Sequence, residues 1–146
     1  MLQISIHGLE LTISQLQALD RRIENLSPLL KEIGEDMVES TKQRFVSTTD
    51  PDGNQWKKNS QVTLDRKSGS RPLTNEGHLA ASIDYQLLGG KSVEIGSPLD
   101  QAAMMQFGGK KAEFGQLWGD IPARPYLGLS AADERLVLDL VKDYLL

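Results

Sequence analysis

The sequence predicts an α+β fold in which a small, mostly antiparallel sheet is packed by a long N-terminal helical segment and a C-terminal helix. Three observations support this prediction: a long apolar stripe at helical spacing, two runs of alternating residues around Gly89-Gly90, and an apolar C-terminal run behind a capping serine. The chain has 146 residues, a length typical of one domain. We therefore expect a single domain over residues 1–146.

The N-terminal third is predicted to be a short strand followed by helix. Leu2, Ile4 and Ile6 alternate with polar residues, which is the period of a strand. Apolar residues then recur in steps of three and four, which predicts one buried helix face: Leu16, Leu19, Ile23, Leu26, Leu30, Ile33 and Met37, prolonged by Thr41 and Phe45. Ser27-Pro28 suits a helix start, so we expect two helices or one kinked helix; a coiled coil is the rival interpretation.

The second half predicts a hairpin, a short helix, an extended segment and a final helix. Residues 82–87 and 92–95 alternate on either side of Gly89-Gly90, a pair that can supply positive φ angles for the turn. Residues 100–107 suit a short helix, and the prolines of residues 122–130 favour an extended segment or edge strand. Ser130, with Asp133 three residues later, is predicted to cap the last helix.

Residues 49–72 and 108–121 are expected to form long mobile loops. The first carries five bases against three acids, while the whole chain has a net charge of −4. Three interpretations of the bases around Trp56 stay open. One is a loop that binds single-stranded nucleic acid, another is a loop that becomes ordered against a partner protein, and the third is a solvated loop anchored by Trp56. In the second loop, Phe114 and Trp118 either close over the core or form a contact with a partner.

No pattern predicts catalysis, a metal site or a cofactor. The chain has no cysteine and only two histidines, His7 and His78, without metal-ligand spacing. Gly90-Lys91-Ser92 lacks the earlier glycine of a phosphate-binding loop, and Asp50-Pro51-Asp52-Gly53 fails the spacing of a calcium loop. We expect a protein that is not an enzyme, although a hydrolase with paired carboxylates stays open as a rival. No apolar run is long enough to span a membrane.

An ordered series of landmarks runs through the chain: Arg44-Phe45, Asp50-Pro51-Asp52-Gly53 with Trp56, Leu73 to Leu79, Val93 to Gly96, Gln106-Phe107-Gly108, and Ile121 to Ser130. This series resembles the phage virion morphogenesis family, which includes tail-completion proteins of Mu-like phages and prophages. The resemblance implies a structural role in tail completion or head–tail joining, with other tail or neck proteins as partners. It also implies a homo-oligomeric ring, often of six subunits, made in the host cytoplasm and then part of the virion.

Two groups of residues follow from this interpretation. We expect partner contacts from Trp56, Lys57, Lys58, Arg66, Lys67, Phe114 and Trp118, and fold-defining roles for Phe45, Phe107, Pro122, Arg124, Pro125 and Tyr126. Arg124, set between two prolines, is predicted to pair with an acid or to cap carbonyl groups. No specific nucleic-acid partner is expected from an acidic chain; the alternative is a small nucleic-acid-binding module that uses residues 49–72.

Overall fold

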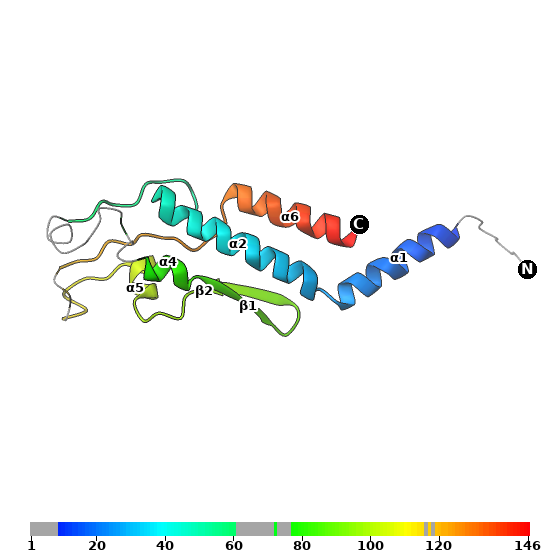
Figure 1. Ribbon diagram of the computed structural model, residues 1–146, viewed down its shortest axis with the longest axis horizontal. Coiled ribbons are helices and arrows are strands. Elements are labelled where there is room, and N and C mark those ends of the chain that lie inside the picture. The colour runs from blue at the N-terminus through cyan, green and yellow to red at the C-terminus, as the bar shows by residue number, and fades with distance from the viewer. Residues whose placement is uncertain (1–8, 61–71, 73–76, 116, 118) are drawn as a thin grey trace, which may run out of the picture.

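The computed structural model describes residues 9–60, 72, 77–115, 117 and 119–146, with the side chains of residues 9–12 excluded. Its elements are α1 (Leu9–Glu24), α2 (Ser27–Ser47), α4 (His78–Ser82), β1 (Asp84–Leu88), β2 (Ser92–Gly96), α5 (Ala102–Phe107) and α6 (Ala131–Leu145). Figure 1 shows α2 at the centre, with the β1–β2 hairpin and α6 packed along it and α1 leading away from this body. The α+β prediction is confirmed.

The helix break falls where the sequence predicts it. Two separate helices form, and Pro28 occupies the first turn of α2, where its missing N–H costs no helical hydrogen bond. The predicted cap is wrong in detail, because Leu26 is the N-cap residue and no side chain caps this end. Instead, the Leu30 N–H donates to the Leu26 carbonyl over 2.9 Å.

The apolar stripe is buried along α2 and exposed along α1. Ile33, Met37 and Phe45 are buried, as expected. Leu16 and Ile23, however, are 59% and 51% exposed, so the prediction of one continuously buried face is wrong for α1. The physical reason is that α1 extends beyond the hairpin, and its packing in the described part of the chain is against α6.

The predicted hairpin is confirmed. β1 and β2 pair antiparallel from Asp84 opposite Gly96 to Leu88 opposite Ser92. Gly89 and Gly90 both have positive φ, at 59° and 69°, as a tight hairpin turn requires. Tyr85 lies on the inward face and packs over Gly34 of α2, where a Cβ atom would come within 2.5 Å of the tyrosine ring.

Two apolar clusters hold the body together. The first lies between the end of α2, α4, α5 and the extended segment, and contains Phe45, Trp56, Leu79, Ile83, Ala102 and Tyr126. The second joins α2 to α6 and the hairpin, and is built from Leu29, Ile33 and Met37 with Val137, Leu140, Val141 and Tyr144 around them. Phe45 and Tyr126, two of the residues expected to define the fold, are 3% and 1% exposed.

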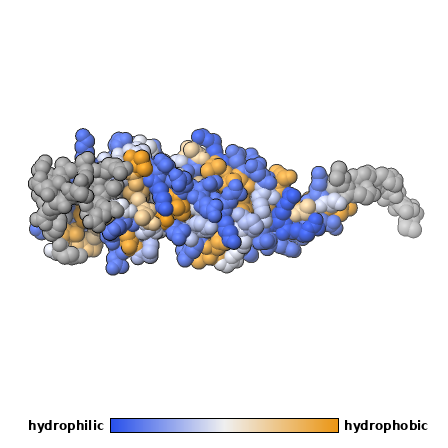
Figure 2. Space-filling model, in the orientation of Figure 1, coloured by the Kyte–Doolittle hydropathy of each residue, from blue (hydrophilic) through white to orange (hydrophobic). Residues whose placement is uncertain are grey.

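The remaining predictions concern the short helix, the extended segment, the last helix and the N-terminal strand. The short helix near residues 100–107 and the Ser130–Asp133 capping box of α6 are both confirmed. Residues 122–129 form no strand, and the residue before them, Ile121, makes an isolated bridge with Gly109. The predicted strand at residues 2–7 lies outside the described residues. No helix in the described part of the chain is long and apolar enough to cross a membrane, and the face drawn in Figure 2 mixes hydrophobic patches with a hydrophilic surface.

Candidate interaction site

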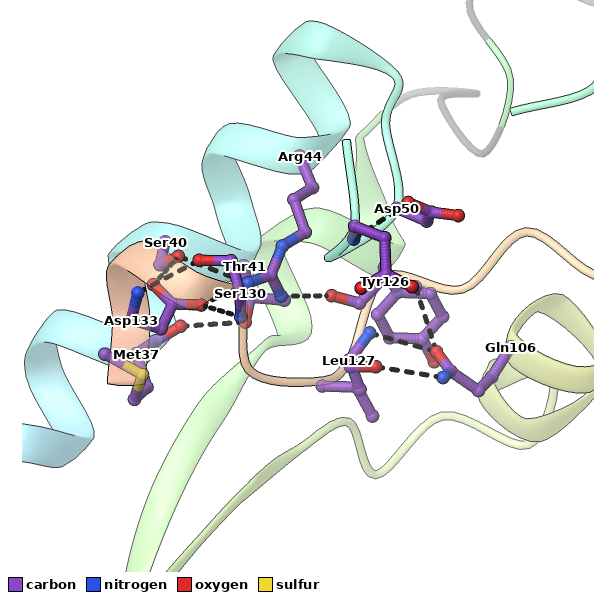
Figure 3. Close-up of polar contacts among 11 residues, drawn as sticks. Met37, Ser40, Thr41, Arg44, Asp50, Gln106, Tyr126, Leu127, Ser130 and Asp133 are labelled. Carbon is purple, nitrogen blue, oxygen red and sulfur yellow. Dashed lines mark hydrogen bonds and ion pairs between the residues drawn. The ribbon is translucent and has the colours of Figure 1, made fainter. Parts of the chain in front are cut away.

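A polar clamp fixes the extended segment that runs from Pro122 to Ser130. The Gln106 side-chain oxygen accepts hydrogen bonds from the backbone N–H groups of Tyr126 and Leu127, both at 3.0 Å. Its amide nitrogen donates to the Leu127 carbonyl over 3.1 Å (Figure 3). One side chain therefore satisfies backbone groups that a neighbouring strand would otherwise bond. This role accounts for the Gln106 landmark.

Arg124 ties the same segment to the residues that follow the Asp50–Asn54 turn. Its guanidinium donates from Nε to the Lys57 carbonyl over 2.7 Å and from Nη2 to the Lys58 carbonyl over 3.0 Å. The prediction that Arg124 caps carbonyl groups is confirmed. Burial lowers the pKa of Arg124, but the side chain stays charged because the pKa of arginine is ordinarily above 12. The charge makes both hydrogen bonds stronger than neutral ones.

Trp56 also belongs to this junction. Its indole N–H donates to the Pro125 carbonyl over 2.8 Å, and its ring meets Phe45 edge-on at 5.5 Å. With 6% of its surface exposed, Trp56 anchors the turn to the core. Its ring is therefore not exposed for the partner contact expected of it.

A buried ion pair joins α2 to α6 beside the clamp. Arg44 Nη2 lies 2.5 Å from Asp133 Oδ2, and Nη1 donates to the Tyr126 carbonyl over 2.8 Å. Asp133 also accepts hydrogen bonds from the Ser40 hydroxyl and the Ser130 backbone N–H (Figure 3). Burial alone would raise the pKa of Asp133, but the hydrogen bonds from Ser40 and Ser130 and the charge of Arg44 together lower it.

The sequence predicts a place for Arg44, as a landmark, and for Asp133, as a capping residue. It does not predict that the two side chains form an ion pair. The available signal was a charged residue on the same helix face as Met37 and Thr41, because an arginine within a buried stripe requires a partner.

Next to the clamp, the surface forms a groove of about 530 Å³. It is lined by Lys57, Phe107, Gly108, Gly109, Lys110, Glu113, Asp120, Ile121 and Pro122. Phe107, one of the residues expected to define the fold, is 77% exposed and takes no part in the apolar core. Its position at the C-terminal end of α5 turns the ring outward, while the preceding Gln106 points back into the clamp. Pro122 lines the groove and is partly buried.

Backbone contacts of Gly108 and Gly109 shape the groove. Gly109 and Ile121 exchange two hydrogen bonds of 2.9 and 2.7 Å, which close the base of the 108–121 loop. Gly108 has a φ of +72°, and a Cβ atom there would lie 2.6 Å from the Ile121 carbonyl oxygen and the Ala123 nitrogen. Only glycine fits such a close approach without backbone movement.

The structure brings together some of the expected contact residues. Lys57 lines the groove, Lys58 is exposed beside it, and Phe114 is 38% exposed on the 108–121 loop. Arg66, Lys67 and Trp118 lie outside the described residues. Within the residues the structure describes, no group of three or more acidic or histidine side chains could hold a metal ion.

The structure defines a small α+β protein whose surface carries a groove lined by an exposed aromatic side chain, Phe107. Comparison with known proteins places it more closely: the model of the phage virion morphogenesis family matches residues 5–146, and the chain belongs to that family. The landmarks noted in the sequence include Gln106 and Tyr126, which the clamp brings together, and Arg124, which ties the same segment to Lys57 and Lys58.

Two relatives agree with this assignment. The chain is 31% identical over 144 residues to the Mu-like prophage FluMu G protein 2 of Haemophilus influenzae. The alignment covers 99% of this chain and 96% of the relative. It is 35% identical over 114 residues to the putative capsid assembly protein G of Escherichia phage Mu. This alignment covers 73% of this chain and 70% of that protein. No solved structure matches.

Proposed function

We propose that the protein is a structural component that acts in tail completion or head–tail joining. It would do so through contacts with other tail or neck proteins, in a ring of its own copies for which six is the expected number. It would be made in the host cytoplasm and end in the virion, at the tail end or neck. The family supports a role in virion assembly, and the exposed Phe107 in the groove supports a role that depends on protein contacts.

The groove has the make-up of a protein interface. Phe107 lines it and offers about 1.5–3 kcal/mol on full burial, and aromatic anchors dominate many interfaces. Around it lie Lys57, Lys110, Glu113 and Asp120, so both signs of charge are present at the rim. Mixed charges at a rim favour a specific partner surface over a uniformly charged one.

Substitution of Phe107 tests this role. In a Mu-like prophage that lacks the native gene, Phe107→Glu should leave the purified protein folded, because the side chain is exposed. It should weaken the contact by about tenfold or more, the effect of losing about 1.4 kcal/mol of contact free energy, and so lower the yield of infectious particles. Leu138→Ala is a matched control, since Leu138 is 58% exposed on α6 away from the groove. Full particle yield with Phe107→Glu would contradict the groove as a contact site.

A second assay separates this proposal from the nucleic-acid alternative. Lys57, Lys58, Arg66 and Lys67 are all replaced by alanine, and DNA binding is measured against salt. We expect no salt-dependent DNA binding by the wild type or by the variant with the four alanine substitutions. Binding by the wild type that the substitutions abolish would favour the nucleic-acid module.

A further inference from the structure

A second concavity lies on the β1–β2 hairpin, and we call it the hairpin pocket. It has a volume of about 540 Å³ and is lined by residues of both strands and by Ser97-Pro98, which follow β2. It includes the end of the hairpin where Asp84 pairs with Gly96. Its charged lining residues are Asp84 and Glu94, and none of the described residues that line it is a base.

The negative charge of the hairpin pocket is not neutralised by its surroundings. Asp84 and Glu94 are both exposed, and neither forms an ion pair with another described residue. Glu94 accepts a hydrogen bond from the Gln86 side chain across the strands at 3.1 Å, which leaves further acceptor capacity on a carboxylate. Lys91 lies in the turn, at the other end of the hairpin from Asp84. The pocket is therefore suited to a partner that carries positive charge.

The groove beside Phe107 has the opposite excess of charge. Its lining and the positions next to it carry four lysines against two carboxylates: Lys57, Lys58, Lys110 and Lys111 against Glu113 and Asp120. One of the two carboxylates, Asp120, also accepts the backbone N–H of Lys111 over 2.9 Å. The groove therefore favours a partner surface with an excess of acid.

The turn that carries two of these lysines is held in place by hydrogen bonds. The backbone N–H groups of Glu113 and Phe114 both donate to the Lys110 carbonyl at 3.0 Å, and the bond from Lys111 to Asp120 closes the turn from the other side. A turn that is already ordered loses less conformational entropy when it docks. The lysines are thus presented in a defined place beside Phe107, which is 77% exposed.

Both halves of this complementary contact lie on one chain, but they do not meet within one copy. Asp84, Glu94 and the lysines of the groove are exposed, and the described residues form no ion pair between the two sets. The whole chain has a net charge of −4, so another copy offers an excess of acid to the groove. The partly buried Tyr85 and Ile95 in the hairpin pocket offer apolar surface to Phe107. A second copy is therefore the occupant that the charges favour.

We propose that the lysine-bearing groove of one copy docks on the hairpin pocket of the next copy. The proposal rests on the contact groove and the ring of the proposed function, and it names the partner of that groove. The groove and the pocket share no lining residue, so the contact is heterologous and can close into a ring by rotation. The opposite charges set the orientation of the two copies, and salt weakens their attraction.

Cysteine cross-linking tests this contact, because the chain has no native cysteine. An Ala112→Cys protein, altered at an exposed position next to Lys111, is mixed with a Gln86→Cys protein, altered in the hairpin pocket, and treated with a short bis-maleimide. We expect several-fold more cross-linked pair than from Ala112→Cys with Gln43→Cys, an exposed control on α2. Raised salt should lower the yield.

A charge swap makes the result decisive. Glu94→Lys in the hairpin partner sets like charges against the groove and should reduce the cross-link to the control level. Glu39→Lys should leave it unchanged, since Glu39 is an exposed glutamate on α2 that also bonds a glutamine side chain. Lys110→Glu with Lys111→Glu in the other partner should restore the cross-link to the Glu94→Lys protein. An initial yield equal to the control, no loss with Glu94→Lys, or no recovery after the swap would each overturn the proposal.

Particle yield separates the failure of this contact from the failure of the proposed function. In the prophage, Glu94→Lys should lower the yield of infectious particles, as Phe107→Glu does. If Glu94→Lys gives full yield and the cross-link fails while Phe107→Glu still lowers the yield, a second copy is the wrong occupant. The groove would then keep its role in assembly through another partner.

Discussion

Arg124 fixes the place of two surface lysines through their backbone. Its two hydrogen bonds end on the carbonyls of Lys57 and Lys58, so the guanidinium holds one wall of the groove without lining it. Gln106 does the same for the extended segment from the other side. The side chains most deeply involved in the candidate site are therefore positioning residues.

Replacement of Arg124 should lower stability and loosen this wall. We expect Arg124→Ala to reduce the free energy of unfolding by about 2–3 kcal/mol, the range for lost hydrogen bonds to a charged group, in urea denaturation. Arg124→Lys should recover less than half of the loss, because an ammonium group lacks the planar fork. Arg135→Ala, an exposed change on α6, should stay within about 0.5 kcal/mol of wild type. Wild-type stability of Arg124→Ala would contradict the role of Arg124.

The ion pair of Arg44 and Asp133 predicts a loss of stability in acid. The pKa of Asp133 is lowered in the folded protein, so the unfolded state takes up the proton first. The stabilising contribution is therefore complete above the unfolded value of about 3.9 and is lost as the pH falls through the lower folded value. Asp133→Asn should remove this part of the pH dependence.

The same variant leaves Arg44 buried without its charge partner. We expect Asp133→Asn to cost about 3–5 kcal/mol at neutral pH, measured by urea denaturation from pH 7 to 3. Asp139→Asn on the exposed side of α6 is the control. An equal acid response from wild type and Asp133→Asn would show that another group is responsible.

Among the elements, α2 shows packing overriding helix propensity. Gly34 lies in the middle of the helix, where alanine is favoured by about 1 kcal/mol. A Cβ atom there would meet the Tyr85 ring at 2.5 Å, and overpacking of this kind costs about 1–3 kcal/mol. We therefore expect Gly34→Ala to destabilise the protein in urea denaturation. Tyr85→Leu should relieve part of that cost, and a more stable Gly34→Ala protein would show that the hairpin moves away freely.

Elements set by local chemistry were predictable from the sequence. The Gly89-Gly90 turn, the break at Pro28 and the Ser130–Asp133 cap each depend on a few neighbouring residues. The predictions that were wrong concern which residues are covered by other parts of the fold. The stripe through Leu16 and Ile23 has helical spacing whether or not another element covers it, and an exposed Phe107 has the same sequence signal as a buried one. The clamp of Gln106 joins residues 20 positions apart, a distance at which pattern carries no information.

For the whole molecule, the arrangement separates a rigid body from surfaces left open for contact. The clamp, the ion pair and the two apolar clusters hold α2, α5, α6 and the extended segment together. α5, which ends at Phe107, lies at one end of this body, and α1 extends from the other (Figure 1). Two different contact surfaces on one subunit are what a closed ring with further partners requires.

The particles made without the protein test the central proposal most directly. A Mu-like prophage with this gene deleted is induced, and the lysate is examined by electron microscopy, with the restored wild-type gene as control. A role in tail completion or head–tail joining predicts normal filled heads alongside separate tails, and few joined particles. Absent or malformed heads would contradict it and would instead favour a role in building the capsid.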